Sequence, residues 1–106
     1  MKLEQLKYFM EAVKYKSISV AADENFISQP TFSSSITKLE KELGVALLRR
    51  TSRGVSPTLA GEIVLDKAEH IFATIDEMAQ EVSMSSKTGI IKLSAVTSIY
   101  NQIIPS

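Results

Sequence analysis

The chain has 106 residues, 44% of them hydrophobic, which is enough for one small domain with a core and some additional chain. It contains no cysteine, which excludes a disulfide and a thiolate metal site, and it has no apolar run typical of a signal peptide or a membrane span. Lysine and arginine balance the acidic residues overall, but residues 1–57 carry a net charge of +3 and residues 58–106 one of −3. We therefore expect a cytoplasmic protein whose N-terminal part is the basic one.

Two helices are predicted at the start of the chain. An apolar stripe at helical spacing predicts the first helix over about residues 3–15. Ser17 or Ser19 can cap a short second helix, which we expect to run to Phe26. This second helix contains two consecutive alanines, which are small enough for two helices to cross closely. The stripe of the first helix consists of Leu3, Leu6, Met10 and Val13, with Phe9 beside it.

A third helix over residues 28–43 has signals at both ends. Ser28 can accept a bond from a first-turn N–H group, Pro30 needs no donor in that turn, and Gly44 fits a left-handed position after the last turn. Its outer face begins with short, neutral hydrogen-bonding side chains, which suit close approach to a phosphate or a base edge. Together with the second helix it predicts a helix-turn-helix. The inner face consists of Phe32, Ile36, Leu39 and Leu43, and the outer face begins with Gln29, Thr31, Ser33, Ser34, Ser35 and Thr37.

Residues 45–57 predict a small two-stranded wing. Val45–Arg50 is the expected first strand and Val55–Pro57 the returning strand, with Arg53 and Gly54 at the tip. All three arginines of the chain lie in this segment, so the wing concentrates positive charge.

A long helix is predicted over residues 58–86, with Thr58 as its cap. It would be about 40 Å long at a rise of about 1.5 Å per residue, and an apolar seam follows it at alternating spacings of three and four. A body of 57 residues cannot cover so long a helix, so we expect part of the seam to meet a second chain. Ile63, Ile71 and Met78 broaden the seam on one side. The seam consists of Leu65, Ala68, Phe72, Ile75, Ala79 and Val82.

The last residues differ in composition from the long helix. Residues 83–89 have the composition of a linker, and residues 90–96 predict a strand. Thr97 and Ser98 follow, before a segment that could begin another helix.

Taken together, the motifs resemble the LysR-type transcriptional regulators of bacteria over residues 1 to about 86. The resemblance implies a mainly α fold: a winged helix-turn-helix DNA-binding domain over 1–57, a linker helix over 58–86 for dimerisation, and a hinge and truncated start of an effector-binding domain over 87–106. The motifs are AA at 21–22, SQP at 28–30, Ser33, LEKELG at 39–44, RR at 49–50, RG at 53–54, Thr58 and AG at 60–61.

The resemblance also implies partners. These are a double-stranded DNA operator, a second copy in a homodimer, a tetramer in the full-length regulator, and a small-molecule effector that only the full-length protein binds. The effector domain would have a periplasmic-binding-protein-like fold, and Thr97 and Ser98 resemble its first ligand-contacting turn. At Ser34 many members have an arginine that touches DNA, which Arg49 partly offsets by adding charge near the wing. Two further departures are Leu48, where phenylalanine is usual, and Leu59, where proline is frequent.

We therefore expect a sequence-specific transcriptional regulator that binds a two-half-site operator as a dimer, with helix 28–43 in the major groove and the wing at 45–57 beside it. Gln29 can pair with adenine through two hydrogen bonds, and Arg53 can hold a phosphate or enter a minor groove. Arg49 and Arg50 alternate along a strand, so one should face DNA and the other an acidic residue. The predicted DNA-binding residues are Ser28, Gln29, Pro30, Thr31, Ser33, Ser34, Thr37, Lys38, Arg50 and Arg53.

A second hypothesis stays open: a winged-helix protein-interaction module without DNA binding, which the zero net charge mildly favours. Gln29 would then be an ordinary first-turn surface residue and Arg53 an ordinary turn residue. An enzyme is not expected, because no nucleophile–base pair and no glycine-rich phosphate loop is present. The single His70 has no second ligand near it, so neither a metal nor a cofactor is expected.

Overall fold

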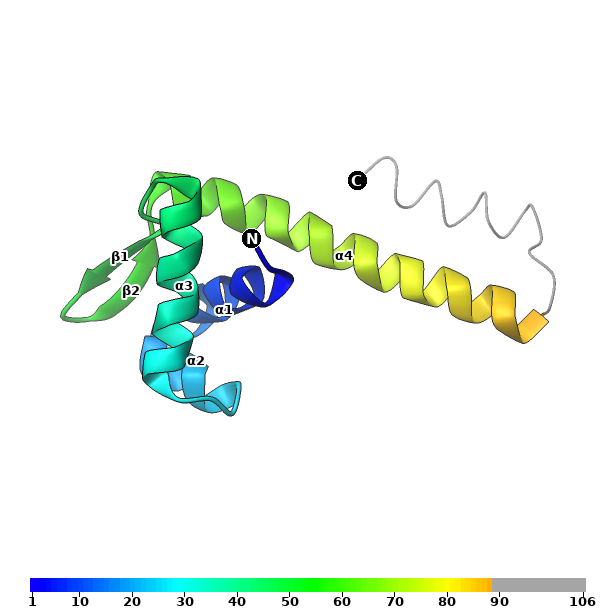
Figure 1. The fold of residues 1–106 in the computed structure, drawn as a ribbon, viewed down its shortest axis with the longest axis horizontal. Coiled ribbons are helices and arrows are strands. Elements are labelled where there is room, and N and C mark those ends of the chain that lie inside the picture. The colour runs from blue at the N-terminus through cyan, green and yellow to red at the C-terminus, as the bar shows by residue number, and fades with distance from the viewer. Residues whose placement is uncertain (89–106) are drawn as a thin grey trace. The chain divides into compact units, whose positions relative to one another are not determined.

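The computed structural model describes residues 1–88, which form four helices and a two-stranded antiparallel sheet (Figure 1). They divide between a compact unit, Met1–Ala68, and a second unit that begins at Glu69. The predicted strand at 90–96 and the predicted effector residues Thr97 and Ser98 lie outside the described residues. The elements are α1 (Leu3–Tyr15), α2 (Ile18–Glu24), α3 (Gln29–Leu43), β1 (Leu48–Thr51), β2 (Gly54–Pro57) and α4 (Leu59–Thr88).

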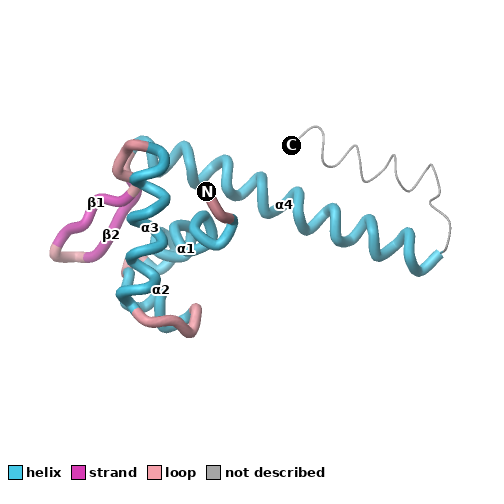
Figure 2. Tube along the Cα trace, in the orientation of Figure 1, coloured by secondary structure: helices cyan, strands magenta, loops and turns pink. Residues whose placement is uncertain are grey.

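The core of the first unit lies where α1 packs against both α2 and α3 (Figure 2). The Tyr8 ring lies 5.0 Å from the Phe32 ring, measured between centroids, and burial raises the pKa of the Tyr8 hydroxyl, with Glu4 as a smaller cause. A leucine, isoleucine or phenylalanine side chain stabilises the fold by about 1.5–3 kcal/mol when it is fully buried. The buried side chains of the three helices are Leu6, Phe9, Ala12, Ile18, Ala21, Ala22, Phe32, Ile36 and Leu39.

The predicted bounds of α1 are confirmed, but its buried face is rotated from the predicted stripe. Leu6, Phe9 and Ala12 are buried, whereas Leu3 is 49% exposed. A face centred on Phe9 brings the small Ala12 inward, which favours the close crossing of α1 with its neighbours.

The turn between α2 and α3 corrects the predicted end of the second helix. Ser17, one of the two candidate caps, accepts a bond from the Val20 N–H group at 3.1 Å. The helix ends at Glu24 and not at Phe26, because Phe26 has a φ of 58°, a left-handed conformation that cannot continue a right-handed helix. Phe26 is also 94% exposed. The side chain of Asn25 closes the last turn by donating to the Ala21 carbonyl at 2.8 Å.

Both predicted ends of α3 are confirmed. The Ser28 hydroxyl accepts from the Thr31 N–H group at 3.3 Å, and Gly44 follows the helix with a φ of 72°. The buried face is shorter than predicted, since Leu43 is 40% exposed.

The predicted wing is present, with a later start and a different tip. Thr51 pairs with Gly54, so the two residues at the tip are Ser52 and Arg53. The first strand begins at Leu48 and not at Val45, because the Val45 N–H group still donates to the Glu40 carbonyl at the end of α3.

Two glycine positions bring the wing and the next helix close to other backbone segments. A Cβ atom at Gly54 would overlap the Lys16 carbonyl oxygen, which accepts from the Val55 N–H group at 3.2 Å. A Cβ atom at Gly61 would overlap the Leu47 carbonyl oxygen. The absence of a side chain at these two glycines therefore fixes how closely the wing and α4 approach the rest of the unit.

Thr58 connects α4 to the segment before the wing. Its hydroxyl accepts from the Gly61 N–H group at 3.0 Å and donates to the Ala46 carbonyl at 2.7 Å. The predicted cap is therefore confirmed. Among the described residues the helix runs to Thr88, two residues beyond the predicted end.

Candidate nucleic-acid interface

The predicted DNA-binding residues of α3 lie opposite its buried face. The first turn is open, and no acidic residue lies in it that would repel an anion. Of the ten predicted residues, Ser33 and Thr37 are half-buried. The other eight are exposed: Ser28, Gln29, Pro30, Thr31, Ser34, Lys38, Arg50 and Arg53. The N-terminal end of a helix carries a partial positive charge, so this surface suits contact with a phosphate as well as with a base edge.

The wing lies directly beside this helix. Both terminal guanidinium nitrogens of Arg50 are 3.4 Å from the Ser33 hydroxyl oxygen. Arg49 is also exposed, and neither arginine pairs with an acidic side chain among residues 1–88, contrary to the expectation that one of them would. The sequence-predicted residues of α3 and β1 are thus brought together, and Arg53 is placed at the wing tip.

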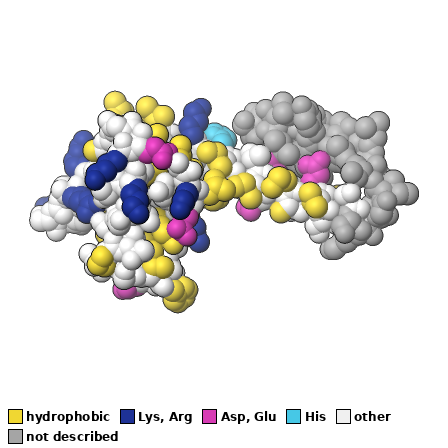
Figure 3. Space-filling view, in the orientation of Figure 1, with side chains coloured by type: hydrophobic (Ala, Val, Ile, Leu, Met, Phe, Trp, Pro, Cys, Tyr) yellow, Lys and Arg dark blue, Asp and Glu magenta, His cyan; other side chains and the backbone are white. Residues whose placement is uncertain are grey.

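The charge on this unit agrees with the distribution along the chain. Figure 3 shows several lysine and arginine side chains spread over the visible face of the unit Met1–Ala68. A surface of this sign attracts a polyanion at long range, and the attraction weakens as salt is added.

Sequence reasoning assigned Glu40 no role beyond its place in the LEKELG motif. The Glu40 carboxylate accepts bonds from the N–H groups of Leu47 and Leu48, at 2.7 and 3.1 Å. The sequence offered one signal for this role: an acidic residue one turn before the helix-ending Gly44, close enough to accept from backbone N–H groups just after the helix.

The predicted seam of α4 is only partly exposed. Ala68 is 1% exposed and belongs to the compact unit Met1–Ala68, so it offers a partner almost no surface. Leu65, Phe72 and Ile75 are half-buried, whereas Ala79 and Val82 are exposed. The three residues that broaden the seam are all exposed: Ile63 by 61%, Ile71 by 40% and Met78 by 56%.

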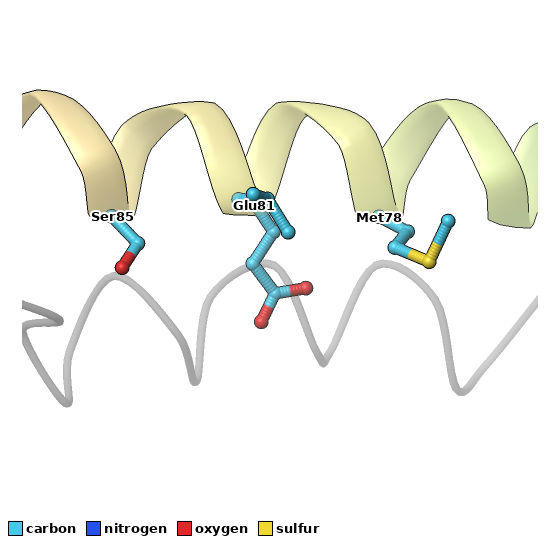
Figure 4. Close-up of a pocket in the computed structure, with 4 residues that line it drawn as sticks. Met78, Glu81 and Ser85 are labelled. Carbon is cyan, nitrogen blue, oxygen red and sulfur yellow. The ribbon is translucent and has the colours of Figure 1, made fainter.

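One shallow cavity lies on the second unit. It has a volume of about 350 Å³, and the described residues that line it, Met78, Glu81, Val82 and Ser85, all come from α4. Figure 4 shows the labelled Met78, Glu81 and Ser85 on the same side of the helix. These four described residues come from one helix face and present no converging set of polar groups.

Residues 1–88 contain neither a candidate metal cluster nor a candidate membrane span. No group of three or more histidine, cysteine or acidic side chains there could hold a metal ion. No helix within that range combines the length and the hydropathy that crossing a membrane requires.

An exposed polar helix, a tight turn before it and an arginine-bearing hairpin beside it define the class: a winged helix-turn-helix domain of the kind that enters DNA grooves. The chain belongs to the LysR family of bacterial regulatory helix-turn-helix proteins, whose family model matches residues 3–62. The resemblance inferred from the motifs and the mainly α winged fold are both confirmed, and the family is one of transcriptional regulators and not of enzymes.

The chain is similar in sequence to known bacterial regulators. The hydrogen peroxide-inducible genes activator of Haemophilus influenzae is 34% identical over 107 residues, which cover 99% of this chain and 36% of that protein. The DNA-binding transcriptional dual regulator OxyR of Escherichia coli K12 is 38% identical over 88 residues, covering 83% of this chain and 29% of that protein. The chain therefore spans about a third of the length of these relatives.

Solved structures agree in fold. The BenM_DBD/catB site 1 DNA complex matches with a TM-score of 0.78 and 36% identity, over 81% of this chain and 96% of that one. The CbnR_DBD–DNA complex matches with a TM-score of 0.76 and 31% identity, over 81% of this chain and 99% of that one. Both neighbours are DNA-binding domains held in complexes with DNA.

Proposed function

We propose that the chain is the DNA-binding part of a LysR-type regulator that recognises a two-half-site operator as a homodimer. Within it, residues 1–57 form the winged helix-turn-helix, residues 58–86 the dimerisation helix, and residues 87–106 a hinge and the start of an effector-binding domain. The observation that supports this most directly is the exposed polar face of α3 with Arg50 of the wing beside it. A regulator of bacterial promoters would work in the cytoplasm, where the chromosome lies.

The proposed recognition divides between two elements. The first turns of α3 would enter the major groove, where Gln29 can read a base edge and Ser33, Ser34 and Thr37 can bond bases or phosphates. The wing would lie against the adjacent backbone or minor groove, where Arg50 and Arg53 meet phosphates. Lys38 would reach the backbone from the far part of α3. This division predicts base selectivity from the helix and salt dependence from the wing.

The proposed dimer is supported by the apolar side chains that α4 exposes. Soluble monomers rarely tolerate a long apolar stripe in water. In the second unit the stripe contains Phe72, Ile75 and Val82, with Ile71 and Met78 beside it. Pairing two such helices would bury these side chains and fix the separation of two α3 helices, so that they reach two half-sites. The full-length regulator would assemble further, into a tetramer.

A small-molecule effector would be bound by the full-length protein and not by these 106 residues. A ligand cleft is closed by strands and loops from distant parts of a domain. Calorimetry with candidate effectors on this chain should give no heat of specific binding, whereas a longer chain that contains the remaining domain should give it.

A salt titration tests the main proposal. Binding to a duplex from the native promoter region should fall steeply with salt, because each phosphate contact releases a counterion. A random duplex of equal length should bind more weakly with a similar slope. Failure to bind either duplex at low salt would contradict the proposal and favour the alternative, a winged-helix module for protein interaction.

A further inference from the structure

Glu40 binds the segment that connects α3 to the wing, through its backbone carbonyl and through its side chain. Its backbone carbonyl accepts from the N–H groups of Gly44 and Val45, at 2.8 and 3.1 Å. Its carboxylate accepts from the N–H groups of Leu47 and Leu48, at 2.7 and 3.1 Å. One residue therefore binds four of the five N–H groups in the segment that leads from α3 into β1.

The two hydrogen bonds that the Glu40 carboxylate accepts could not be replaced by bonds to water without cost. The side chains of Leu47 and Leu48 are buried, which holds their backbone groups near the protein interior. A donor in such a place is costly when it has no partner, and bonds to a charged acceptor are stronger than bonds between neutral groups. Loss of the Glu40 acceptor should therefore loosen this segment, which would still be bound to Thr58 through the Ala46 and Leu47 carbonyls.

The same helix contacts the strand at a second point. Ser33 and Glu40 are seven residues apart, which is about two turns, so both lie on the same side of α3. Glu40 binds Leu48, the first residue of β1, and Ser33 contacts Arg50, the third. The strand is thus fixed along α3 at two separate places.

From this geometry we propose that Glu40 is a positioning residue for DNA recognition, a role that rests on the proposed function. It does not touch DNA itself. It sets the distance between the base-reading face of α3 and the wing arginines, so that both can contact one duplex without reordering. Freeing the wing should remove its phosphate contacts while the base contacts of α3 remain.

Two substitutions distinguish the effect of losing the hydrogen-bond acceptor at Glu40 from the effect of changing the shape of its side chain. Glu40→Met keeps an unbranched chain of similar length but accepts no strong hydrogen bond. Glu40→Gln keeps an acceptor, and because both N–H groups bind the same carboxylate oxygen, Oε2, one amide oxygen can accept both bonds. Glu42→Met is the matched control: it removes the same charge from the same end of α3 and breaks the ion pair with the Met1 amino group, but it leaves the bonds to Leu47 and Leu48 intact.

DNA binding gives the first readout. Glu40→Met should lower the salt slope by about two units, for the phosphate contacts of Arg50 and Arg53, on cognate and random duplexes alike. The preference for cognate over random DNA should stay within about twofold of the parent chain. Glu40→Gln and Glu42→Met should keep the parent slope. An unchanged slope in folded Glu40→Met would overturn the proposal and leave Glu40 a purely structural role.

A second readout needs no DNA and therefore separates this proposal from the proposed function. The chain has no cysteine, so Ser34→Cys and Ser52→Cys give unique sites for two spin labels, one on α3 and one at the wing tip. The distribution of distances between the labels should broaden in Glu40→Met and stay narrow in Glu40→Gln. Equal widths in both would overturn the positioning role. Broadening in a chain that binds no DNA would instead refute the proposed function and leave Glu40 as the residue that holds the wing on α3. If Glu40→Met does not fold, Glu40→Asp replaces it in both experiments. Aspartate is shorter by one methylene, so its carboxylate lies farther from the two N–H groups.

Discussion

The guanidinium group of Arg50 lies against the hydroxyl of Ser33, with both terminal nitrogens 3.4 Å from the oxygen. This contact joins the wing strand to the helix that carries the polar outer face. A guanidinium has five N–H donors, so the contact leaves most of them available to a further acceptor. Both side chains lie in the predicted DNA-binding set, and their contact means that the two elements would approach a duplex as one surface.

We expect Gln29→Ala to weaken binding selectively at the cognate site. One good base contact is worth about 1–3 kcal/mol of discrimination. Because Gln29 is exposed at the start of α3, its replacement should not disturb folding, so a loss of affinity would report on DNA contact. Fluorescence anisotropy on cognate and random duplexes would measure the difference. Equal losses on both duplexes would remove Gln29 from the base-reading residues.

Arg53→Ala should act on all sequences alike. If the tip arginine holds one phosphate, its loss should weaken cognate and random binding equally and lower the salt slope by about one unit. Lys67→Ala is a suitable control, because it removes the same charge from an exposed position on α4. A change in sequence preference without a change in slope would mean that the tip reads a base or a groove width.

Gly61→Ala should destabilise the domain, although alanine normally favours a helix over glycine by about 0.5–1 kcal/mol. The new Cβ atom would overlap the Leu47 carbonyl oxygen, and overpacking of this kind costs about 1–3 kcal/mol. Gly44→Ala provides the comparison: its left-handed φ is unfavourable for alanine, but no atom lies within 4 Å of the new Cβ. Urea denaturation should show the larger loss at Gly61. A stabilised Gly61→Ala would show that α4 can move away from Leu47 without cost.

Phe26→Gly should raise the free energy of unfolding by up to about 1 kcal/mol. A left-handed conformation costs an ordinary residue about 1–2 kcal/mol, and the exposed ring gains no burial in return. Part of this gain is offset by the greater freedom of glycine in the unfolded chain. Asp23→Gly, an exposed position within α2, should have the opposite sign. Denaturation midpoints that fall for both variants would contradict the expected relief of strain.

Ile75→Asp should convert the proposed dimer into a monomer with a folded winged domain. An aspartate within an apolar helix pair would be desolvated without a partner, which is costly. Operator affinity should then fall towards that for a single half-site, because linkage no longer raises the effective concentration. Sedimentation would measure the oligomeric state at tens of micromolar. A parent chain that sediments as a monomer, or a variant that stays dimeric with full affinity, would refute this interface.

Much of the first unit could be predicted because residues close in sequence determine where its helices and strands begin and end. Ser28, Gly44 and Thr58 act at the ends of helices, where a side chain or a positive φ has one obvious use. The wing followed from its turn and its two short apolar segments. These signals require no knowledge of distant contacts, and for that reason both ends of α3, the presence of the wing and the Thr58 cap agree with the structure.

The features that were missed depend on neighbours that periodicity does not reveal. Phe26 takes a left-handed conformation, although the adjacent Asn25 is the residue type better suited to it. Glu40 binds N–H groups seven and eight residues ahead, across a turn. Ala68 belongs to the seam by spacing, yet it is buried within its own unit. In each case, packing around the residue decided its role.

The wing also bears on how free copies of the protein behave towards one another. A sheet of two strands has no interior strand. Val55 of β2 donates its N–H group to the Lys16 carbonyl, so β1 is the edge to which a further strand could more readily add. Arg49 and Arg50 place charge along β1, and Pro57 removes a donor from β2. These residues oppose the stacking of one hairpin on the next. The arginines proposed to hold DNA phosphates would thus also protect the protein from aggregation during the time it spends away from DNA.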